Sequence, residues 1–235
     1  MPSSLHTTHD MLTLFRQELE LCQVTTGQKV VVLSEAEQAT DYAAAFLIAA
    51  RELGADVFNL NLPSGRSLNL AAKASEVGTN ALSGNRAAID ALKRADLVVD
   101  LIFLLFSKEQ LEIQAAGTRI LLVAEPFEVL SRLFPTPQLR ERVEAGEARL
   151  AKAQHLRFTN PAGTDVSYRL GQYPVLTEYG FTDTPGRWDH WPGGFLATQG
   201  ADAGVDGKVV MARAIFCSRS TDTSKNQLNS RFVRA

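Results

Sequence analysis

Short apolar runs alternate with helical patterns through the first 150 residues of the chain. The run KVVVL, which begins at Lys29, is rich in β-branched residues and predicts a buried strand. An alanine-rich segment at 42–53 predicts a helix with Thr40 or Asp41 as its N-cap. Strands separated by helices at this spacing pair in parallel, with helices on the faces of the sheet. The pattern predicts an α/β fold, with a doubly wound parallel-sheet domain over residues 1–154.

The same reasoning predicts the other elements of this domain. Strands are expected at 56–62, 96–103 and 119–124, and helices at 85–94, 108–116, 128–134 and 138–154. The first strand runs into a loop without glycine, and the chain contains neither a GxGxxG nor a GxxxxGK[ST] pattern. Dinucleotide binding and P-loop chemistry are therefore poorly supported.

Charge and hydropathy exclude several classes of protein. With 24 basic and 26 acidic residues, the chain has no electrostatic basis for binding nucleic acid or an anionic membrane. No apolar run approaches the roughly 20 residues of a spanning helix, and the N-terminus lacks the features of a secretory signal. Of the two cysteines, Cys22 is expected in the core, and neither it nor Cys217 has metal-binding spacing. We expect a cytoplasmic protein without disulfides.

The sequence pattern changes at His155, where strand-like segments surround an Asn-Pro-Ala-Gly turn. We expect residues 155–212 to begin a second, β-rich, metal-binding domain, with a strand that starts at Gly207. Residues 213–235 form an aberrant tail, most of it rich in Ser, Thr, Asn and Arg, with too few apolar side chains to offset the entropy of ordering. Unpaired strand edges would favour self-association, so a homo-oligomer is among the expected states.

The segment TEYGFTDTPGRWDHWPGG, residues 177–194, concentrates charged, aromatic and glycine residues. Its glycine and proline content predicts an ordered loop or a broken strand, and loops held by a rigid scaffold often carry function. Glu178 is a candidate metal ligand or general base, or else an exposed turn carboxylate. His190 is a candidate for proton transfer or hydrogen bonding, or else packs on a neighbouring tryptophan.

Arg187, next to Trp188, has the guanidinium geometry that binds a carboxylate or phenolate through two hydrogen bonds. The alternative is a salt bridge to Asp183 or Asp189. A catalytic metal needs three or four converging ligands, and this segment offers only Glu178, a histidine and nearby aspartates. No complete ligand set is evident from the sequence.

Three stretches of the chain resemble the 2,5-dihydroxypyridine 5,6-dioxygenase family. They are LVVDLIFLLFSKEQ, GTRILLVAEPFEVLSRLFPT and LGQYPVLTEYGFTDTPGRWDHWPGGF. The resemblance covers residues 11–211 and is specific, because GQYP, TEYG and GRWDHWP recur at the same mutual spacing. It implies an Fe(II)-dependent, extradiol-type opening of 2,5-dihydroxypyridine or a related hydroxylated N-heteroaromatic by O2, in nicotinic acid or nicotine degradation. The family is similar in fold to the thermophilic-type metallo-aminopeptidases.

The resemblance also implies roles for individual residues. Glu178 falls on a family carboxylate near the metal, and His190 falls on a histidine that lines the substrate pocket. Phe106 falls where the family carries a histidine, and phenylalanine cannot hydrogen-bond a substrate oxygen or bound O2. We expect Phe106, Arg187 and Trp188 to contact the small aromatic substrate.

The principal iron ligands of the family, two histidines and an aspartate, lie in a C-terminal region for which this chain has no counterpart. Residues 213–227 are compatible, in the neighbouring reading frame, with the Pro-Gly-Asp turn of the family, so we expect a frameshifted tail and an inactive chain. The alternatives are a metallo-aminopeptidase, which needs two metals, and a non-catalytic remnant. The DNA sequence downstream of the Met211 codon tests the frameshift.

Overall fold

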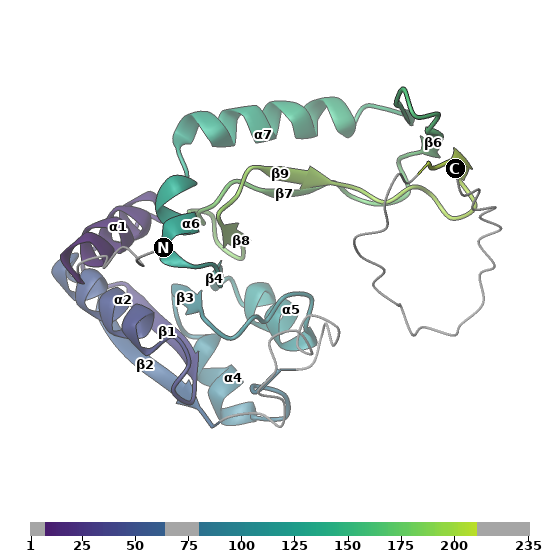
Figure 1. The fold of residues 1–235 in the computed structure, drawn as a ribbon. Helices are drawn as coiled ribbons and strands as arrows, with labels where there is room; N and C mark the ends of the chain where they lie inside the picture. The colour runs from purple at the N-terminus through teal and green to yellow at the C-terminus, as the bar shows by residue number, and fades with distance from the viewer. Residues whose placement is uncertain (1–7, 64–79, 211–235) are drawn as a thin grey trace. The chain divides into compact units, whose positions relative to one another are not determined.

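The computed structural model describes residues 8–63 and 80–210 of the chain (Figure 1). The chain divides into two compact units, one of Met1–Glu141 with Glu178–Phe195, and one of Arg142–Thr177 with Leu196–Ala235. The expected aberrant tail, 213–235, lies outside the described residues. No helix in 8–63 and 80–210 combines the length and apolar character that crossing a bilayer requires.

A five-stranded parallel sheet forms the centre of the first unit. Its strands are β1 (Lys29–Glu35), β2 (Asp56–Leu62), β3 (Leu97–Asp100), β4 (Arg119–Val123) and β8 (Trp188–Trp191). They lie in the order β2-β1-β3-β4-β8, and every neighbouring pair is parallel. Every residue of β3 and β4 is buried, as expected for central strands covered on both faces. The predicted doubly wound α/β fold is confirmed.

Helices cover both faces of this sheet. The helices of this unit are α1 (Thr8–Leu21), α2 (Thr40–Glu52), α4 (Arg86–Leu92), α5 (Lys108–Ala115) and α6 (Phe127–Arg132). A further helix, α7 (Pro137–Leu150), crosses the division between the units. On one face, Ile89 of α4 and Ile113 of α5 pack in one cluster with Trp188 of β8. On the other face, Phe15 of α1 stacks on Phe46 of α2 and meets Trp191 edge-on, with ring centroids 5.7 Å apart. Successive residues of β8 thus face opposite helix layers, which places Trp188 and Trp191 on opposite faces of the sheet.

Several local predictions differ from the structure; for example, α7 ends at Leu150, four residues before the end expected at 154. The α2 N-cap is Ala39 in a left-handed conformation with no side-chain cap, so neither Thr40 nor Asp41 has the expected role. Strand β3 ends at Asp100, three residues earlier than expected. The Asp100 carboxylate accepts hydrogen bonds from the backbone N–H groups of Ile102, at 2.9 Å, and Leu104, at 2.8 Å. These bonds turn the chain out of the sheet.

The boundary expected at residue 154 does not coincide with the division into units. Residues 178–195 return to the first unit, because β8 pairs with β4 and becomes the fifth strand of its sheet. The glycine and proline content of the segment around β8 predicted a loop or broken strand, so its place in this sheet was not predicted. Segment 155–212 therefore contributes to both units.

The second unit contains an antiparallel sheet in the order β10-β6-β5, formed by β5 (His155–Thr159), β6 (Asp165–Arg169) and β10 (Val205–Lys208). The ring of Phe158 stacks on Tyr168, with centroids 5.7 Å apart. This sheet agrees with the β-rich character expected after His155. Strands β7 (Leu176–Glu178) and β9 (Phe195–Ala197) form a separate two-stranded sheet.

Candidate functional site

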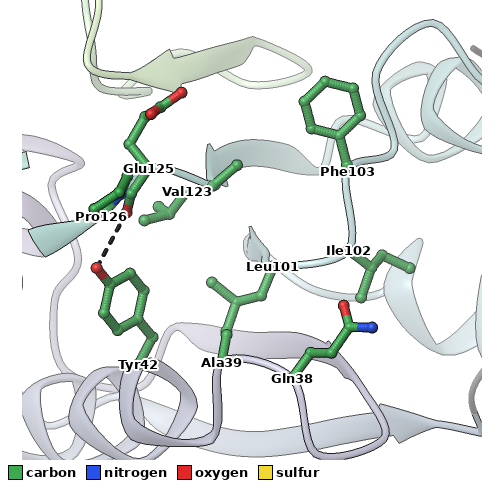
Figure 2. Close-up of a pocket in the computed structure, with 10 residues that line it drawn as sticks. Gln38, Ala39, Tyr42, Leu101, Ile102, Phe103, Val123, Glu125 and Pro126 are labelled. Atoms are coloured by element: carbon green, nitrogen blue, oxygen red, sulfur yellow. Dashed lines mark hydrogen bonds between the residues drawn. The ribbon is translucent and has the colours of Figure 1, made fainter. Parts of the chain in front are cut away.

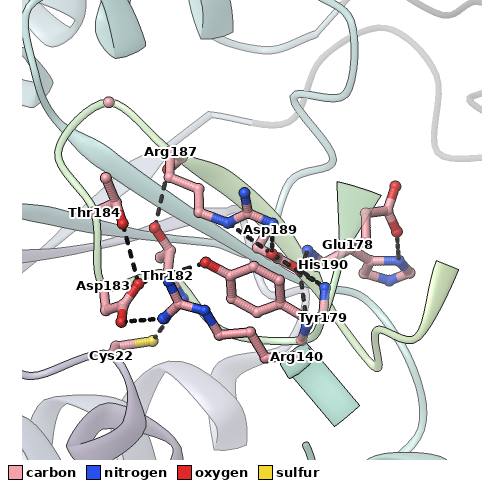
Figure 3. A network of polar contacts seen from close by, with 12 residues as sticks. Cys22, Arg140, Glu178, Tyr179, Thr182, Asp183, Thr184, Arg187, Asp189 and His190 are labelled. Atoms are coloured by element: carbon pink, nitrogen blue, oxygen red, sulfur yellow. Dashed lines mark hydrogen bonds and ion pairs between the residues drawn. The ribbon is translucent and has the colours of Figure 1, made fainter. Parts of the chain in front are cut away.

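Glu178 and His190 are brought together by the folding of segment 177–194. Glu178 ends β7, His190 lies in β8, and their Oε2 and Nδ1 atoms are 3.7 Å apart (Figure 3). The Glu178 side chain is 13% exposed and that of His190 is 23% exposed. The His190 Nε2 atom is buried and has no hydrogen-bond partner among the described residues. A carboxylate beside a buried imidazole with one unused nitrogen is equipped to bind a ligand atom or move a proton.

Asp189 holds this pair in place. Its buried carboxylate accepts hydrogen bonds from the backbone N–H groups of Tyr179 at 3.1 Å, Gly180 at 2.8 Å and His190 at 2.9 Å. Tyr179 directly follows Glu178, so one carboxylate fixes the backbone beside both members of the pair. From the sequence, Asp189 was a candidate salt-bridge partner of Arg187 and one of the aspartates available as metal ligands. Asp189 lies between Trp188 and His190 in the sequence, and nothing in this local pattern indicates that its carboxylate accepts hydrogen bonds from backbone N–H groups.

Arg187 forms the salt bridge that the sequence left open as an alternative. Its Nε and Nη2 atoms donate to Asp189 Oδ2 at 3.0 and 2.6 Å. Its guanidinium also lies over the Tyr179 ring, 3.8 Å from the centroid, and Arg140 lies over the same ring at 4.9 Å. The network fixes the turn that follows Glu178.

The other two expected substrate contacts lie in different environments. Trp188 is 7% exposed and packs in the core cluster of the α4 and α5 face. Phe106 lies in the loop after β3, 57% exposed, with a φ of 58°. The Phe106 N–H donates to Gln110 Oε1 at 2.7 Å, which holds the loop against α5. Substrate contact by Arg187, Trp188 and Phe106 stays a prediction.

Cys22 lies in the core, as expected. It is fully buried, and its sulfur accepts a hydrogen bond from the backbone N–H of Thr182 at 3.4 Å. Burial and the nearby Glu18 carboxylate raise the pKa of the Cys22 thiol well above its ordinary value. The thiol is therefore protonated and unreactive at neutral pH.

Two buried aspartates have raised pKa values at this end of the sheet. Burial raises the pKa of Asp189 to about 6, although the Arg187 charge opposes this rise. Burial likewise raises the pKa of Asp100 to about 6, opposed by its backbone hydrogen bonds and by the charge of His190. Asp100 pairs with Leu122 across β3 and β4, and Leu122 pairs with His190 across β4 and β8. Asp100 thus lies in the same row and on the same face of the sheet as His190.

Asp100 predicts a defined pH dependence of stability. Its pKa rises from 3.8 in the unfolded chain to about 6 in the folded one, so the folded state holds the proton that the unfolded state loses between these values. Stability contributed by Asp100 therefore falls as pH rises from about 4 to about 6, by up to about 3 kcal/mol. Urea unfolding of the wild type and Asp100→Asn over pH 4 to 7 measures this difference.

Asp165→Asn provides a control of opposite sign. A hydrogen bond from Arg157 lowers the pKa of Asp165, so its contribution to stability is lost as pH falls. The free-energy difference between the wild type and Asp165→Asn should stay nearly constant from pH 4 to 7 and fall only below about pH 4, whereas that for Asp100→Asn should shrink as pH rises from about 4 to about 6. A difference for Asp100→Asn that stays constant over this range would show that Asp100 titrates normally.

The described residues do not complete a metal centre. Within 8–63 and 80–210, no group of three or more His, Cys, Asp or Glu side chains is arranged to hold a metal ion. Glu178 and His190 supply one carboxylate and one imidazole, ligand types that iron accepts, but a non-haem iron site takes at least one more protein ligand. The two residues therefore fit only part of an iron site, and no reaction step through iron follows from them.

Comparisons with known proteins identify the family of the chain. The family model described as 2,5-dihydroxypyridine 5,6-dioxygenase matches residues 10–221, a range that runs beyond Met211, where the resemblance was expected to stop. A 2,5-dihydroxypyridine 5,6-dioxygenase of Pseudomonas putida is 42% identical over 200 residues, which are 84% of this chain and 57% of the relative. The chain therefore spans little more than half the length of this relative.

Solved structures give the same result. The structure of 2,5-dihydroxypyridine dioxygenase from Pseudomonas putida matches with a TM-score of 0.77 and 42% identity, over 81% of this chain and 56% of that chain. Wild-type AmpT from Thermus thermophilus matches with a TM-score of 0.51 over 85% of this chain and 63% of that one, and at 15% identity this likeness concerns the fold alone. From the family match and the 42% identity, the chain belongs to the 2,5-dihydroxypyridine 5,6-dioxygenase family.

Proposed function

We propose that this chain serves the O2-dependent opening of the ring of 2,5-dihydroxypyridine or a related hydroxylated N-heteroaromatic, with Fe(II) as the cofactor. The observation that carries the proposal is the Glu178–His190 pair, 3.7 Å apart and fixed by the Asp189 carboxylate. The relative at 42% identity bears the name of this activity. A cytoplasmic location, a place in nicotinic acid or nicotine degradation, and self-association are parts of the same proposal.

Each member of the pair has a role within the proposal. The buried and unpartnered Nε2 of His190 hydrogen-bonds a substrate oxygen, or carries a proton to or from it. The Glu178 carboxylate orients the imidazole through Nδ1 and contributes a negative charge beside the metal. Glu178 would hold a bound Fe(II) as one ligand of an incomplete set, and the metal would supply the chemistry that activates O2. Phe106 offers an apolar surface to the ring in place of a hydrogen-bond donor.

Binding and turnover are expected to separate in this chain. Only two metal-ligating side chains converge among the described residues, so we expect the chain to bind the aromatic substrate but to turn it over negligibly. Turnover is measured as O2-dependent loss of 2,5-dihydroxypyridine absorbance with added Fe(II). Rapid loss of absorbance would show that the metal ligands are complete and would refute the expected inactivity.

Anaerobic titration with 2,5-dihydroxypyridine in the presence of Fe(II) tests the proposal. We expect Glu178→Gln and His190→Gln each to weaken binding about tenfold, because each loses a charge-assisted contact. His155→Gln is the control, because His155 is an exposed residue of β5. Leucyl-anilide cleavage with added zinc or cobalt, without dihydroxypyridine binding, would instead indicate an aminopeptidase. Binding of neither ligand would indicate a non-catalytic domain.

A further inference from the structure

A cavity of about 600 Å³ lies at the carboxyl ends of β1, β3 and β4 (Figure 2). Three parts of the chain line it. The loop after β1 and the start of α2 contribute Gln38, Ala39 and Tyr42. The loop after β3 contributes residues 101–103, and the end of β4 with the turn that follows contributes residues 123–126. The strand order reverses between β1 and β3, and open α/β sheets bind ligands in the crevice at such a point. Neither Glu178 nor His190 lines the cavity. The cavity is thus a separate feature of the first unit.

The loops around this cavity hold an unusual backbone. Ala39 and Phe103, which line it, have φ values of 53° and 66°. The same two loops contain Ala36 and Phe106, with φ values of 49° and 58°. Four of the six described non-glycine residues with positive φ therefore lie in these two loops. Residues held in this region cluster at ligand clamps and active sites, where the surrounding structure enforces them.

The wall of the cavity is largely aliphatic and carries little polar chemistry. The Tyr42 hydroxyl donates to the backbone oxygen of Glu125 at 3.1 Å, and the other polar side chains of the lining are those of Gln38 and Glu125. Among the residues that the structure describes, the lining includes no lysine, arginine or histidine. Burial, together with the charges of Glu128 and Glu125, raises the pKa of Tyr42 to about 12. The phenol is therefore neutral, and the net charge of the lining is negative.

Glu125 and Phe103 give one end of the cavity its chemical character. The Glu125 carboxylate and the Phe103 ring rise at the same end of the cavity, on opposite sides (Figure 2). A carboxylate together with an aromatic ring is a recurring arrangement for binding an organic cation. A volume of about 600 Å³ is within the usual range for ligand pockets and exceeds the space that one pyridine ring occupies.

We propose that this cavity is a second small-molecule site, which binds an amphipathic organic cation with its apolar, ring-bearing body inside and its protonated nitrogen between Glu125 and Phe103. The aliphatic wall buries the body of the ligand. The carboxylate and the ring face select for positive charge. The proposed contacts involve neither Glu178 nor His190 and need no metal.

Three probes with the same phenyl body and different charges test the proposal with the full chain. They are phenethylammonium, neutral 2-phenylethanol and anionic phenylacetate, titrated into the protein by calorimetry. We expect the cation to bind about tenfold more tightly than the alcohol, and the anion more weakly than both. Equal affinity for the three probes, or no binding of the cation, would overturn the proposal.

Variants locate the site. Glu125→Gln should weaken binding of phenethylammonium about tenfold and leave binding of 2-phenylethanol unchanged, because only the charge contact is lost. Phe103→Leu should also weaken binding of the cation more than that of the alcohol. Glu141→Gln is the matched control, since this exposed carboxylate of α7 does not line the cavity. A loss of cation binding in Glu141→Gln equal to that in Glu125→Gln would refute the assigned location.

Discussion

Asp189→Ala is expected to lower the free energy of unfolding by about 3–5 kcal/mol, as for other broken buried ion pairs. The Asp189 carboxylate is fully buried and is the acceptor for Arg187 and for the backbone N–H groups of Tyr179, Gly180 and His190. Its removal takes this carboxylate away from Arg187 and leaves three backbone N–H groups without their acceptor. Urea unfolding at pH 7 measures the loss.

Asp90→Ala is the control for this experiment. Asp90 forms only exposed ion pairs with Arg86 and Lys93, so its removal should cost less than about 1 kcal/mol. Asp189→Asn keeps the shape of the side chain and should retain part of the stability, yet it should still weaken dihydroxypyridine binding, because it disturbs the backbone beside Glu178 and His190. If Asp189→Ala cost no more than Asp90→Ala, the carboxylate would not hold the site.

Gly193→Ala is the second change with a large expected effect, about 3 kcal/mol. A Cβ at Gly193 would overlap the backbone at Gly180 N and Tyr179 C, and would lie 2.7 Å from Gly180 Cα. The backbone N–H of the next residue, Gly194, donates to the backbone carbonyl oxygen of Glu178 at 2.8 Å, so the two segments are in direct contact. Backbone atoms cannot move aside as a flexible side chain does. The substitution therefore pushes the Glu178 segment away from β8.

Thermal unfolding and dihydroxypyridine titration together measure this effect, and Gly117→Ala is the matched control. A Cβ at Gly117 would meet nothing within 4 Å, and its cost is that of a left-handed backbone at φ 93°, about 1–2 kcal/mol. We expect Gly193→Ala to lose both stability and substrate binding, and Gly117→Ala to lose only stability. Equal stability of Gly193→Ala and the wild type would contradict the close backbone approach.

Local sequence patterns predicted the parallel sheet because its strands bury both faces. The runs that became β1 and β4 are apolar nearly throughout, and helices with regular apolar spacing separate them. Strand β8 was not assigned to this sheet because the glycine and proline content of segment 177–194 indicated a loop or a broken strand. Two of its four residues, Asp189 and His190, are also types that a buried strand rarely contains. The protein accommodates this aspartate by giving it an arginine and three backbone donors.

The composition of the Glu178–His190 site was visible in the sequence, but its geometry was not. The family resemblance named both residues, whereas their 3.7 Å contact depends on how two short strands return past each other. No local periodicity encodes such a return. The cavity at the switch point is equally non-local, because three loops far apart in the chain enclose it.

A double-mutant cycle on Glu178 and His190 tests the central claim most directly. The affinity of the iron-supplemented chain for 2,5-dihydroxypyridine is measured for the wild type, Glu178→Gln, His190→Gln and the double variant. If both residues bind one ligand, the affinity of the double variant should be about that of the single variant with the lower affinity, since neither residue binds the ligand fully without the other. Losses that simply add, or single variants that bind like the wild type, would contradict a shared site.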